Sequence, residues 1–256
     1  MTEPATIIAI IFLSFIMESI DSGIGMMYGT LLSPLLIIIG FNPLVVVPSI
    51  LLSQAIGGFA ATFHHHKFKN ASFGRGTADI KITALVIGVG VCALLLGVYA
   101  GGYIPTFWLK FYIGLLCIVM GTIIMIKRTF KFSWLKIAGL GIISSFNKSF
   151  TGGGFGPIMA SGQIASGVEE KRAIGITDFA EAPICIISFA AWILINGFND
   201  YTLMVPMCGG AFLGGLTGPY LLSKVKNKKV IKTAVGTLAI VSGIIVMLKL
   251  FGCLKI

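Results

Sequence analysis

The chain has 256 residues, of which 56% are hydrophobic and only 11% are charged, and its mean hydropathy is +0.99. Soluble domains carry about 25% charged residues, so this composition excludes an ordinary soluble domain and predicts that lipid surrounds the protein. The net charge of +10 does not indicate a face for nucleic acid, because the cations lie in short clusters between apolar runs.

Two long, interrupted apolar regions and six simple spans follow one another along the chain. A simple span needs about 20 apolar residues to cross a hydrocarbon core of about 30 Å. The first interrupted region, residues 5–41, is broken at residues 22–29 (SGIGMMYG), and the second, residues 137–168, is broken at residues 147–157 (NKSFTGGGFGP). The simple spans are 43–63, 82–104 and 111–126 after the first region, and 173–195, 201–223 and 230–248 after the second.

Each interrupted region is too long for one span and too short for two spans with a loop. Backbone that leaves a helix inside a membrane must be buried in protein or line a cavity, because lipid offers no hydrogen-bond partner. We therefore expect an all-α integral membrane protein in which each half is a broken or re-entrant helical hairpin followed by three transmembrane helices.

The basic residues predict how these segments cross the membrane, because Lys and Arg near span ends are retained in the cytoplasm. Fifteen of the nineteen lie in four clusters, at residues 67–81, 127–136, 171–172 and 224–232. This distribution places both ends of the first hairpin outside and both ends of the second hairpin inside. The chain then divides into two halves of opposite topology, residues 1–130 and 131–256, within one membrane domain.

A comparison of the two halves supports this division. A shift of 127 residues aligns six pairs across the two interrupted regions and the span after each. The pairs are Ser22 with Ser149, Gly25 with Gly152, Tyr28 with Phe155, Gly29 with Gly156, Gly40 with Gly167, and Gln54 with Glu181. Inverted repeats with broken helices at corresponding positions indicate a transporter whose site lies at the repeat interface.

The sequences of the two interrupted regions, GIGMMYGTLLSPLLIIIGFNP and FTGGGFGPIMASGQIASGVEEKRAIGITDFAE, resemble those of the TauE/SafE family of membrane permeases, also called sulfite exporters. The resemblance covers nearly the whole chain. The second copy matches better, since the first has Met26 and Met27 where glycine is more usual. The resemblance implies transport of a small anion, often sulfur-containing, such as sulfite, a sulfonate or thiosulfate.

Five charged residues lie within the membrane region, namely Glu18, Asp21, Lys148, Asp178 and Glu181. Such residues cost roughly 2.5 to 3.5 kcal/mol on insertion scales and usually face a cavity or a partner. Lys148, with polar neighbours and nearby helix starts, favours an anion site. The alternative is an ion pair with Asp21, its counterpart under the shift. The candidate substrate-binding residues are Asn147, Lys148, Ser149, Thr151, Gly152, Gly153, Gly154, Ser22, Gly23 and Gly25.

Buried carboxylates can also couple transport to protons, because burial disfavours their charged form. Asp178 and Glu181 are three residues apart on one helix and share a face. Glu181 is the first candidate, since it lies deeper and corresponds to Gln54. The candidate proton-coupling residues are Glu181, Asp178, Glu18, Asp21 and Gln54, and hydrogen bonding between helices is the alternative role for them.

Other residues have structural interpretations. The run from His64 to His66 predicts a position at the membrane interface, because adjacent helical residues point in different directions and close poorly on a metal ion. The glycines at 210, 214 and 218 predict close helix packing. The five scattered cysteines predict small buried side chains, and we expect no metal and no cofactor.

The sequence therefore favours a secondary transporter of the cell membrane that works by alternating access, with a small anion, the lipid bilayer and protons as partners and a homodimer as one possible assembly. An anion channel is the first alternative. A membrane-embedded enzyme is the second, but no nucleophile with a base is evident, and no GxxxxGK[ST] nucleotide loop is present.

Overall fold

In the computed structural model, the described residues, 4–25, 27–126, 129–197, 200–223 and 228–254, form an all-helical bundle. The side chains of residues 221–223 and 228 are outside the description. The helices are α1 (Pro4–Ile24), α2 (Tyr28–Ile39), α3 (Pro43–Lys67), α4 (Ala78–Tyr103), α5 (Thr106–Met125), α6 (Trp134–Thr151), α7 (Phe155–Ala165), α8 (Glu170–Asn196), α9 (Met204–Ser223) and α10 (Lys228–Leu250).

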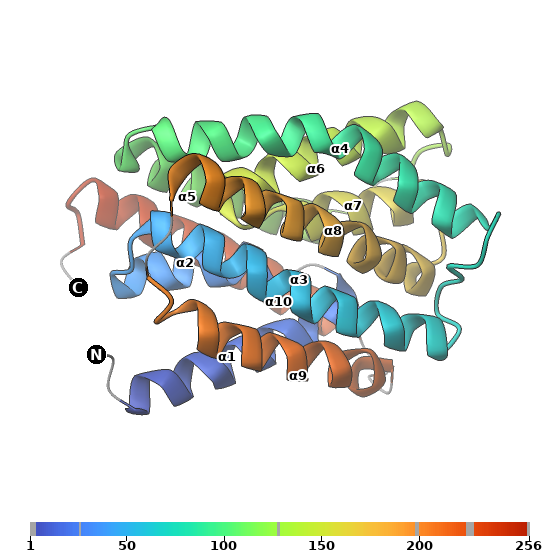
Figure 1. Cartoon of the computed structure of the whole chain (residues 1–256), viewed down its shortest axis with the longest axis horizontal. Helices are drawn as coiled ribbons and strands as arrows, with labels where there is room; N and C mark the ends of the chain where they lie inside the picture. Colours follow the sequence, from blue (N-terminus) through green and yellow to red (C-terminus); the bar gives the residue numbers. More distant parts are fainter. Residues whose placement is uncertain (1–3, 26, 127–128, 198–199, 224–227, 255–256) are drawn as a thin grey trace.

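Both predicted breaks are present. The first interrupted region is α1 and α2, which we call the first hairpin, and the second is α6 and α7, the second hairpin. Figure 1 shows α1 starting at the N-terminal end of the bundle and α2 returning to that same end, whereas α6 and α7 start and finish at the opposite end. We call the break between the two helices of a hairpin, with the first turn of its second helix, the tip.

Six helices in the described part of the chain are long and apolar enough to cross a membrane: α1, α3, α4, α5, α8 and α10. Five of them are among the six simple spans that the sequence predicts. The predicted span 201–223 forms α9, which is not among these six helices. The sixth helix is α1, the first helix of the first hairpin, which has 21 residues. The protein is a multi-pass membrane protein.

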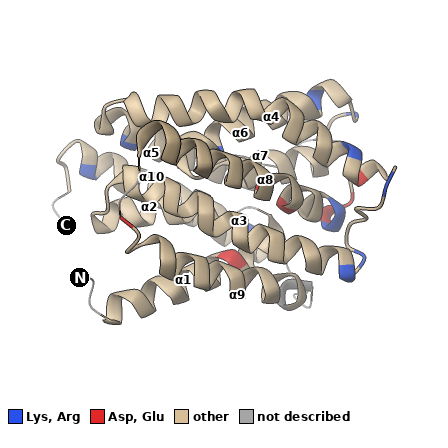
Figure 2. Cartoon of the chain, in the orientation of Figure 1, with Lys and Arg blue, Asp and Glu red and all other residues tan. Residues whose placement is uncertain are grey.

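Charged residues are distributed unevenly between the two ends of the bundle, as Figure 2 shows. The end with the α3–α4 and α7–α8 connections carries Lys67, Lys69, Lys171 and Arg172, and this is the end that the sequence places in the cytoplasm. The predicted basic clusters also include residues 127, 128, 224 and 226, which lie outside the described residues.

The backbone of the two hairpins is similar at equivalent positions. Gly25 and Gly152, paired by the shift of 127 residues, both adopt the left-handed conformation, with φ of 73° and 78°. Gly40 and Gly167, at the far ends of α2 and α7, do so as well, with φ of 113° and 92°. The packing follows the same correspondence: α1 packs on α9 as α6 packs on α4, and α3 on α9 as α8 on α4. These similarities support the inverted repeat, which stays a prediction.

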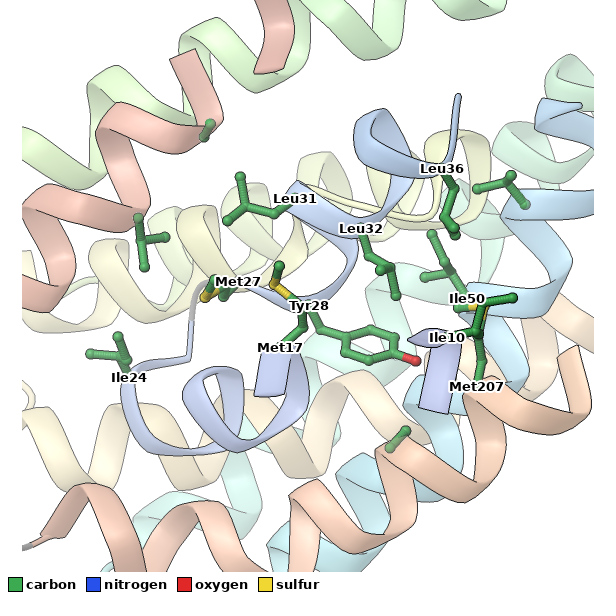
Figure 3. Close-up of a cluster of buried hydrophobic side chains, with 14 of the residues drawn as sticks. Ile10, Met17, Ile24, Met27, Tyr28, Leu31, Leu32, Leu36, Ile50 and Met207 are labelled. Carbon is green, nitrogen blue, oxygen red and sulfur yellow. The ribbon is translucent and has the colours of Figure 1, made fainter. Parts of the chain in front are cut away.

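The first hairpin is held by an apolar cluster shared with α3, α9 and α10. Leu31, Leu32 and Leu36 of α2 are buried against Ile50 of α3 and Met207 of α9 (Figure 3). In lipid such contacts stabilise through close van der Waals packing rather than through removal from water, and a helix of 12 residues depends on these neighbours.

The predicted close packing at Gly210, Gly214 and Gly218 is confirmed, and α1 is the partner. A methyl group at Gly214 would lie 2.7 Å from Glu18 Cβ and 2.8 Å from the Phe15 carbonyl oxygen. No side chain fits between α1 and α9 at these positions, which brings the Glu18 side chain directly against the backbone of α9.

Candidate functional site

The two hairpin tips touch at the centre of the bundle. A methyl group at Gly153 would lie 2.7 Å from the Gly29 carbonyl oxygen, so the two backbones are in direct contact. Two hydrogen bonds join the tips beside this contact. The Gly154 N–H donates to Thr30 Oγ1 at 3.3 Å, and the Ser33 hydroxyl donates to the Thr151 carbonyl at 2.9 Å.

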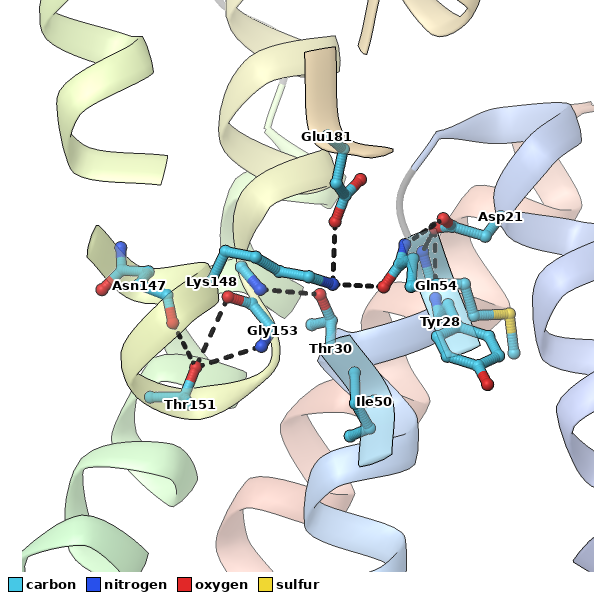
Figure 4. A network of polar contacts seen from close by, with 12 residues as sticks. Asp21, Tyr28, Thr30, Ile50, Gln54, Asn147, Lys148, Thr151, Gly153 and Glu181 are labelled. Atoms are coloured by element: carbon cyan, nitrogen blue, oxygen red, sulfur yellow. Dashed lines mark hydrogen bonds and ion pairs between the residues drawn. The ribbon is translucent and has the colours of Figure 1, made fainter. Parts of the chain in front are cut away.

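The Lys148 ammonium lies beside this contact, between elements of both halves (Figure 4). Its Nζ is 2.8 Å from Glu181 Oε1 on α8 and donates a hydrogen bond to Gln54 Oε1 on α3. Lys148 is only 1% exposed, so its charge is fully desolvated. An ammonium group in this position needs an anionic partner, and Glu181 supplies it in this conformation.

Gln54 connects Lys148 to Asp21. Its Nε2 donates to Asp21 Oδ2 at 2.9 Å. The other carboxylate oxygen of Asp21 accepts hydrogen bonds from the backbone N–H groups of Met27 and Tyr28, the latter at 3.1 Å. Asp21 therefore caps α2, placing a negative charge at the positive end of that helix dipole. The direct Asp21–Lys148 pair considered from sequence is absent, because Gln54 lies between the two.

The start of α7 differs from the start of α2. The Gly154 N–H, the counterpart of the Met27 N–H, donates to the neutral Thr30 hydroxyl, and the first turn of α7 contains no acidic residue. The position that corresponds to Asp21 under the shift is Lys148. The first tip thus brings a carboxylate to the start of α2, whereas the second tip brings a cation close to the start of α7, which has no carboxylate.

The buried charges do not balance. Glu18, Asp21, Asp178 and Glu181 are each no more than 4% exposed, and Lys148 is the lysine buried with them in the described part of the chain. Four ionised carboxylates with one ammonium would leave a large uncompensated charge in a low dielectric, which is strongly unfavourable. The described residues contain no group of three or more side chains that could hold a metal ion.

Glu18 is the least satisfied of these carboxylates. Its Oε2 has no hydrogen-bond partner in the described structure. The side chain lies between α1, α3 and α9, where a methyl group at Gly57 would be 2.7 Å from its carboxyl carbon. An acidic side chain packed this closely against helix backbone is costly to bury in its charged form.

One histidine departs from the sequence-based interpretation. His66 is exposed, as a membrane-interface position requires, but His65 is buried at 3% exposure. Its Nε2 lies 2.9 Å from the Ser22 carbonyl oxygen and 3.2 Å from Asp178 Oδ2. The interface position, which concerns depth in the membrane, stays a prediction, but it did not foresee that the His65 ring faces inward to these partners. The spacing of His65 from Gln54, eleven residues or about three helical turns, indicates the shared face.

The predicted substrate-binding residues fall into two groups. Lys148, Thr151, Gly152, Gly153 and Gly154 lie at the contact between the tips. Four others face elsewhere. Asn147 accepts a 2.5 Å hydrogen bond from the Tyr112 hydroxyl. Ser149 packs against Gly97 of α4, Ser22 bonds back to the Glu18 carbonyl at 2.8 Å, and Gly23 is buried within α1.

Gly25, the remaining candidate, lies at the first break, where a methyl group would be 3.2 Å from Ala160 Cβ of α7. Reasoning from the sequence did not single out Thr30 and Ser33. Their side chains bind backbone groups of the opposite tip, and no charge or glycine run marks them. The signal that could have identified them is their position one and two turns into α2, directly after the first break.

Comparison with known proteins identifies the family to which the chain belongs. A model of the family described as Sulfite exporter TauE/SafE matches residues 10–246. The match begins in α1 and ends in α10, so it includes both hairpins and the buried network. The chain is also similar to the probable membrane transporter protein YtnM of Bacillus subtilis (strain 168), with 22% identity over 232 residues that cover 85% of this chain and 75% of the relative. No solved structure matches the chain.

Proposed function

The chain belongs to the sulfite exporter TauE/SafE family, and from this membership we propose that it is a secondary transporter that moves a small anion across the membrane by alternating access. The observation that carries the proposal is the buried Lys148 ammonium, which lies where the two hairpin tips meet and is paired with Glu181 at 2.8 Å.

Exchange of partners at Lys148 is the central step. An anion that approaches Lys148 meets the Glu181 carboxylate already in place, and two negative charges at one ammonium repel each other. When Glu181 takes up a proton, it becomes neutral and releases Lys148 to the anion. Binding of one anion charge thus requires one proton, which couples the two movements.

The start of α7 supplies the second half of the anion site. Its first N–H groups carry positive potential, and the Gly154 N–H is held by the neutral Thr30 hydroxyl of the opposite tip, which releases it when the tips separate. Asp21 fills the corresponding place at α2 with its own carboxylate. The substrate anion takes at α7 the place that Asp21 takes at α2, and the Thr30 and Thr151 hydroxyl groups lie beside it.

The substrate class follows from the family and from these donors. One ammonium, backbone N–H groups and hydroxyl groups suit a compact oxyanion whose several oxygens each accept a hydrogen bond. A sulfur oxyanion, such as sulfite, a sulfonate or thiosulfate, has this form and agrees with the family description.

Alternating access uses the two hairpins as opposite gates. Each hairpin reaches the centre from one end of the bundle (Figure 1). Separation of the first hairpin from the second exposes Lys148 to one side, and the reverse movement exposes it to the other. The two hydrogen bonds between the tips must break in both cases.

Counterflow in proteoliposomes tests the proposal. Vesicles loaded with unlabelled sulfite, a simple alkanesulfonate or thiosulfate should accumulate the labelled anion transiently, with saturable kinetics. A channel would give fast flux that does not saturate and no counterflow. A membrane enzyme would change the anion chemically. If none of these anions exchanges and none raises the melting temperature, the proposed substrate class is wrong.

A further inference from the structure

A cavity of about 450 Å³ opens at the basic end of the bundle, between the start of α4, the start of α8 and the loop after α3. Lys69, Asn70, Asp79 and Arg172 are among its lining residues. Asp79 and Arg172 form an ion pair in which Arg172 Nη2 lies 2.5 Å from Asp79 Oδ1. The cavity is polar and charged, so water and protons can reach it.

Asn70 connects this cavity to the buried His65. The Asn70 backbone N–H donates to the His65 carbonyl at 2.9 Å, and the Asn70 side-chain Nδ2 is 3.1 Å from His65 Nδ1. On the opposite edge of the ring, Nε2 lies 2.9 Å from the Ser22 carbonyl oxygen and 3.2 Å from Asp178 Oδ2. One ring nitrogen therefore faces the cavity side and the other faces the buried carboxylates.

The partners of the ring define its tautomer. A carbonyl oxygen only accepts hydrogen bonds, so Nε2 carries the hydrogen and donates it to Ser22. The Asn70 amide donates, so Nδ1 has no hydrogen and accepts. Asp178 Oδ2 has no hydrogen bond among the described residues, although it lies close to Nε2. A small rotation of the ring would redirect the Nε2 hydrogen from Ser22 to Asp178.

We infer that His65 transfers protons between the cavity at the basic end and the buried Asp178 and Glu181, and that this route serves the coupling step at Lys148. When a proton moves from the cavity to the buried carboxylates, Nδ1 takes it from cavity water as the Asn70 amide turns aside. The imidazolium then releases its Nε2 proton to Asp178, which returns a neutral ring with its hydrogen on Nδ1. To reset, the ring turns so that Nε2 reaches cavity water, takes up one proton there, loses the Nδ1 proton to the same water, and turns back with its hydrogen on Nε2. The inference rests on the proposed function.

Asp178 continues the route to the transport site. It shares a face of α8 with Glu181, three residues further along, and Glu181 is paired with Lys148. Protons thus have a line of polar groups from the cavity to the ammonium, through Asn70, His65, Asp178 and Glu181.

The other helices packed against α3 supply the remaining titratable groups near His65. Those on α1, α2 and α6 are Glu18, Asp21, Tyr28 and Lys148, and α8 also carries Lys171, Arg172 and Cys185. His64 and His66 flank the ring on α3 itself, and the described side chains of α9 add Cys208 and Tyr220 but no Lys, Arg, Asp or Glu. Asp178 is therefore the charged group in contact with the ring, and its replacement tests the same route.

The experiment compares two modes of transport in proteoliposomes. Anion exchange needs no net proton movement, whereas anion uptake driven by a pH gradient needs one proton for each anion charge. His65→Gln keeps a polar side chain but cannot carry a proton, so we expect at least a tenfold loss of pH-driven uptake with anion exchange retained. The adjacent His64→Gln is the matched control, because His64 is not among the residues that line the cavity and its Nδ1 lies 3.1 Å from the Ala60 carbonyl oxygen, and it should leave both modes unchanged.

Chemical rescue makes the test specific to proton transfer. Added imidazole should restore pH-driven uptake to His65→Ala and should not affect Asp178→Asn, which we expect to show the same selective loss. Equal loss of exchange and uptake in His65→Gln, or full uptake in that variant, overturns the inference. If His65→Gln does not fold, Asp178→Asn decides by the same criterion. Failure of the proposed function is distinct, since the unmodified protein would then show no anion exchange.

Discussion

Lys148 of α6 and Glu181 of α8 form an ion pair, with 2.8 Å between Nζ and Oε1, although the helix α7 separates the two in the chain. Both side chains are almost fully buried. Such a pair is weak evidence for stability, because desolvation offsets much of the attraction between the charges. The pair is better suited to an exchange in which the substrate anion replaces Glu181 at Lys148. The first two predictions test this exchange.

Glu181→Gln should fix the protein in the state in which Lys148 is available. Anion affinity of the unmodified protein should rise as the pH falls, because protonation of Glu181 precedes binding, with up to about tenfold change per pH unit for one proton. The variant should bind independently of pH, with affinity at neutral pH higher by about tenfold, and should lose pH-driven accumulation. Thermal-shift titrations with thiosulfate, whose own charge is constant around neutral pH, measure the affinities, and uptake into proteoliposomes measures the accumulation. A variant with the pH dependence of the unmodified protein would exclude Glu181 as the coupled group.

Lys148→Gln should weaken anion binding by about 10- to 100-fold, since a charge-assisted hydrogen bond contributes about 1.5–3 kcal/mol. The single change also leaves Glu181 buried without its counter-charge, which costs about 3–5 kcal/mol for a pair broken on one side. The double variant with Glu181→Gln should recover the melting temperature but not the affinity. Recovery of both would show that the Lys148 charge has no part in binding the anion.

Gly29→Ala should separate the hairpin tips. A methyl group at Gly29 would lie 2.9 Å from the Gly152 carbonyl carbon, closer than carbon atoms pack. Alanine in a helix normally gains up to about 1 kcal/mol over glycine, so a lower melting temperature and lost transport would reveal the clash. Gly88→Ala and Gly139→Ala are matched controls, because no atom lies within 4 Å of the added methyl. Transport that survives Gly29→Ala would argue against a transport cycle in which the two hairpin tips touch.

The membrane orientation can be tested with single cysteines in a cysteine-free background. Cysteine at Lys69 or Lys131 should react with an impermeant reagent only from the cytoplasm, and cysteine at Asp200 only from outside. Lys228 and Asn199 are further positions suggested by the sequence, but the side chain of the first and the whole of the second lie outside the described residues. Reaction of Lys69 and Lys131 positions from opposite sides would contradict two hairpins of opposite orientation.

The sequence predicts most of the fold because the signals for membrane spans are strong and local. Hydropathy places the spans, and glycine runs place the two breaks within a few residues of where α1 and α6 end. The length of α1 is harder to predict, because apolar residues continue through the first break and only Gly25, at φ 73°, marks the end of the helix.

The site is less predictable because its contacts join residues far apart in sequence. The five intramembrane charges can be recognised from the cost of burying them. Their partners cannot, and so the sequence suggests Asp21 for Lys148 where the structure has Glu181 and Gln54. His65 was missed because its neighbours His64 and His66 lie near the membrane boundary, and the one buried ring among the three depends on the packing of α3 against α8.

The lengths of the two returning helices set the depth in the membrane at which the tips meet. The number of protons that travel with the anion then decides how the membrane voltage acts on it. With 12 residues in α2 and 11 in α7, each spans about 16–18 Å at 1.5 Å per residue, so the tips meet about halfway through the hydrocarbon core. A bare anion moved across the whole membrane would gain or lose about 2.3 kcal/mol per 100 mV. An anion that travels with one proton for each of its charges carries no net charge through this field. The cell's resting potential then neither drives nor opposes its movement, and the pH difference alone determines how far the anion accumulates.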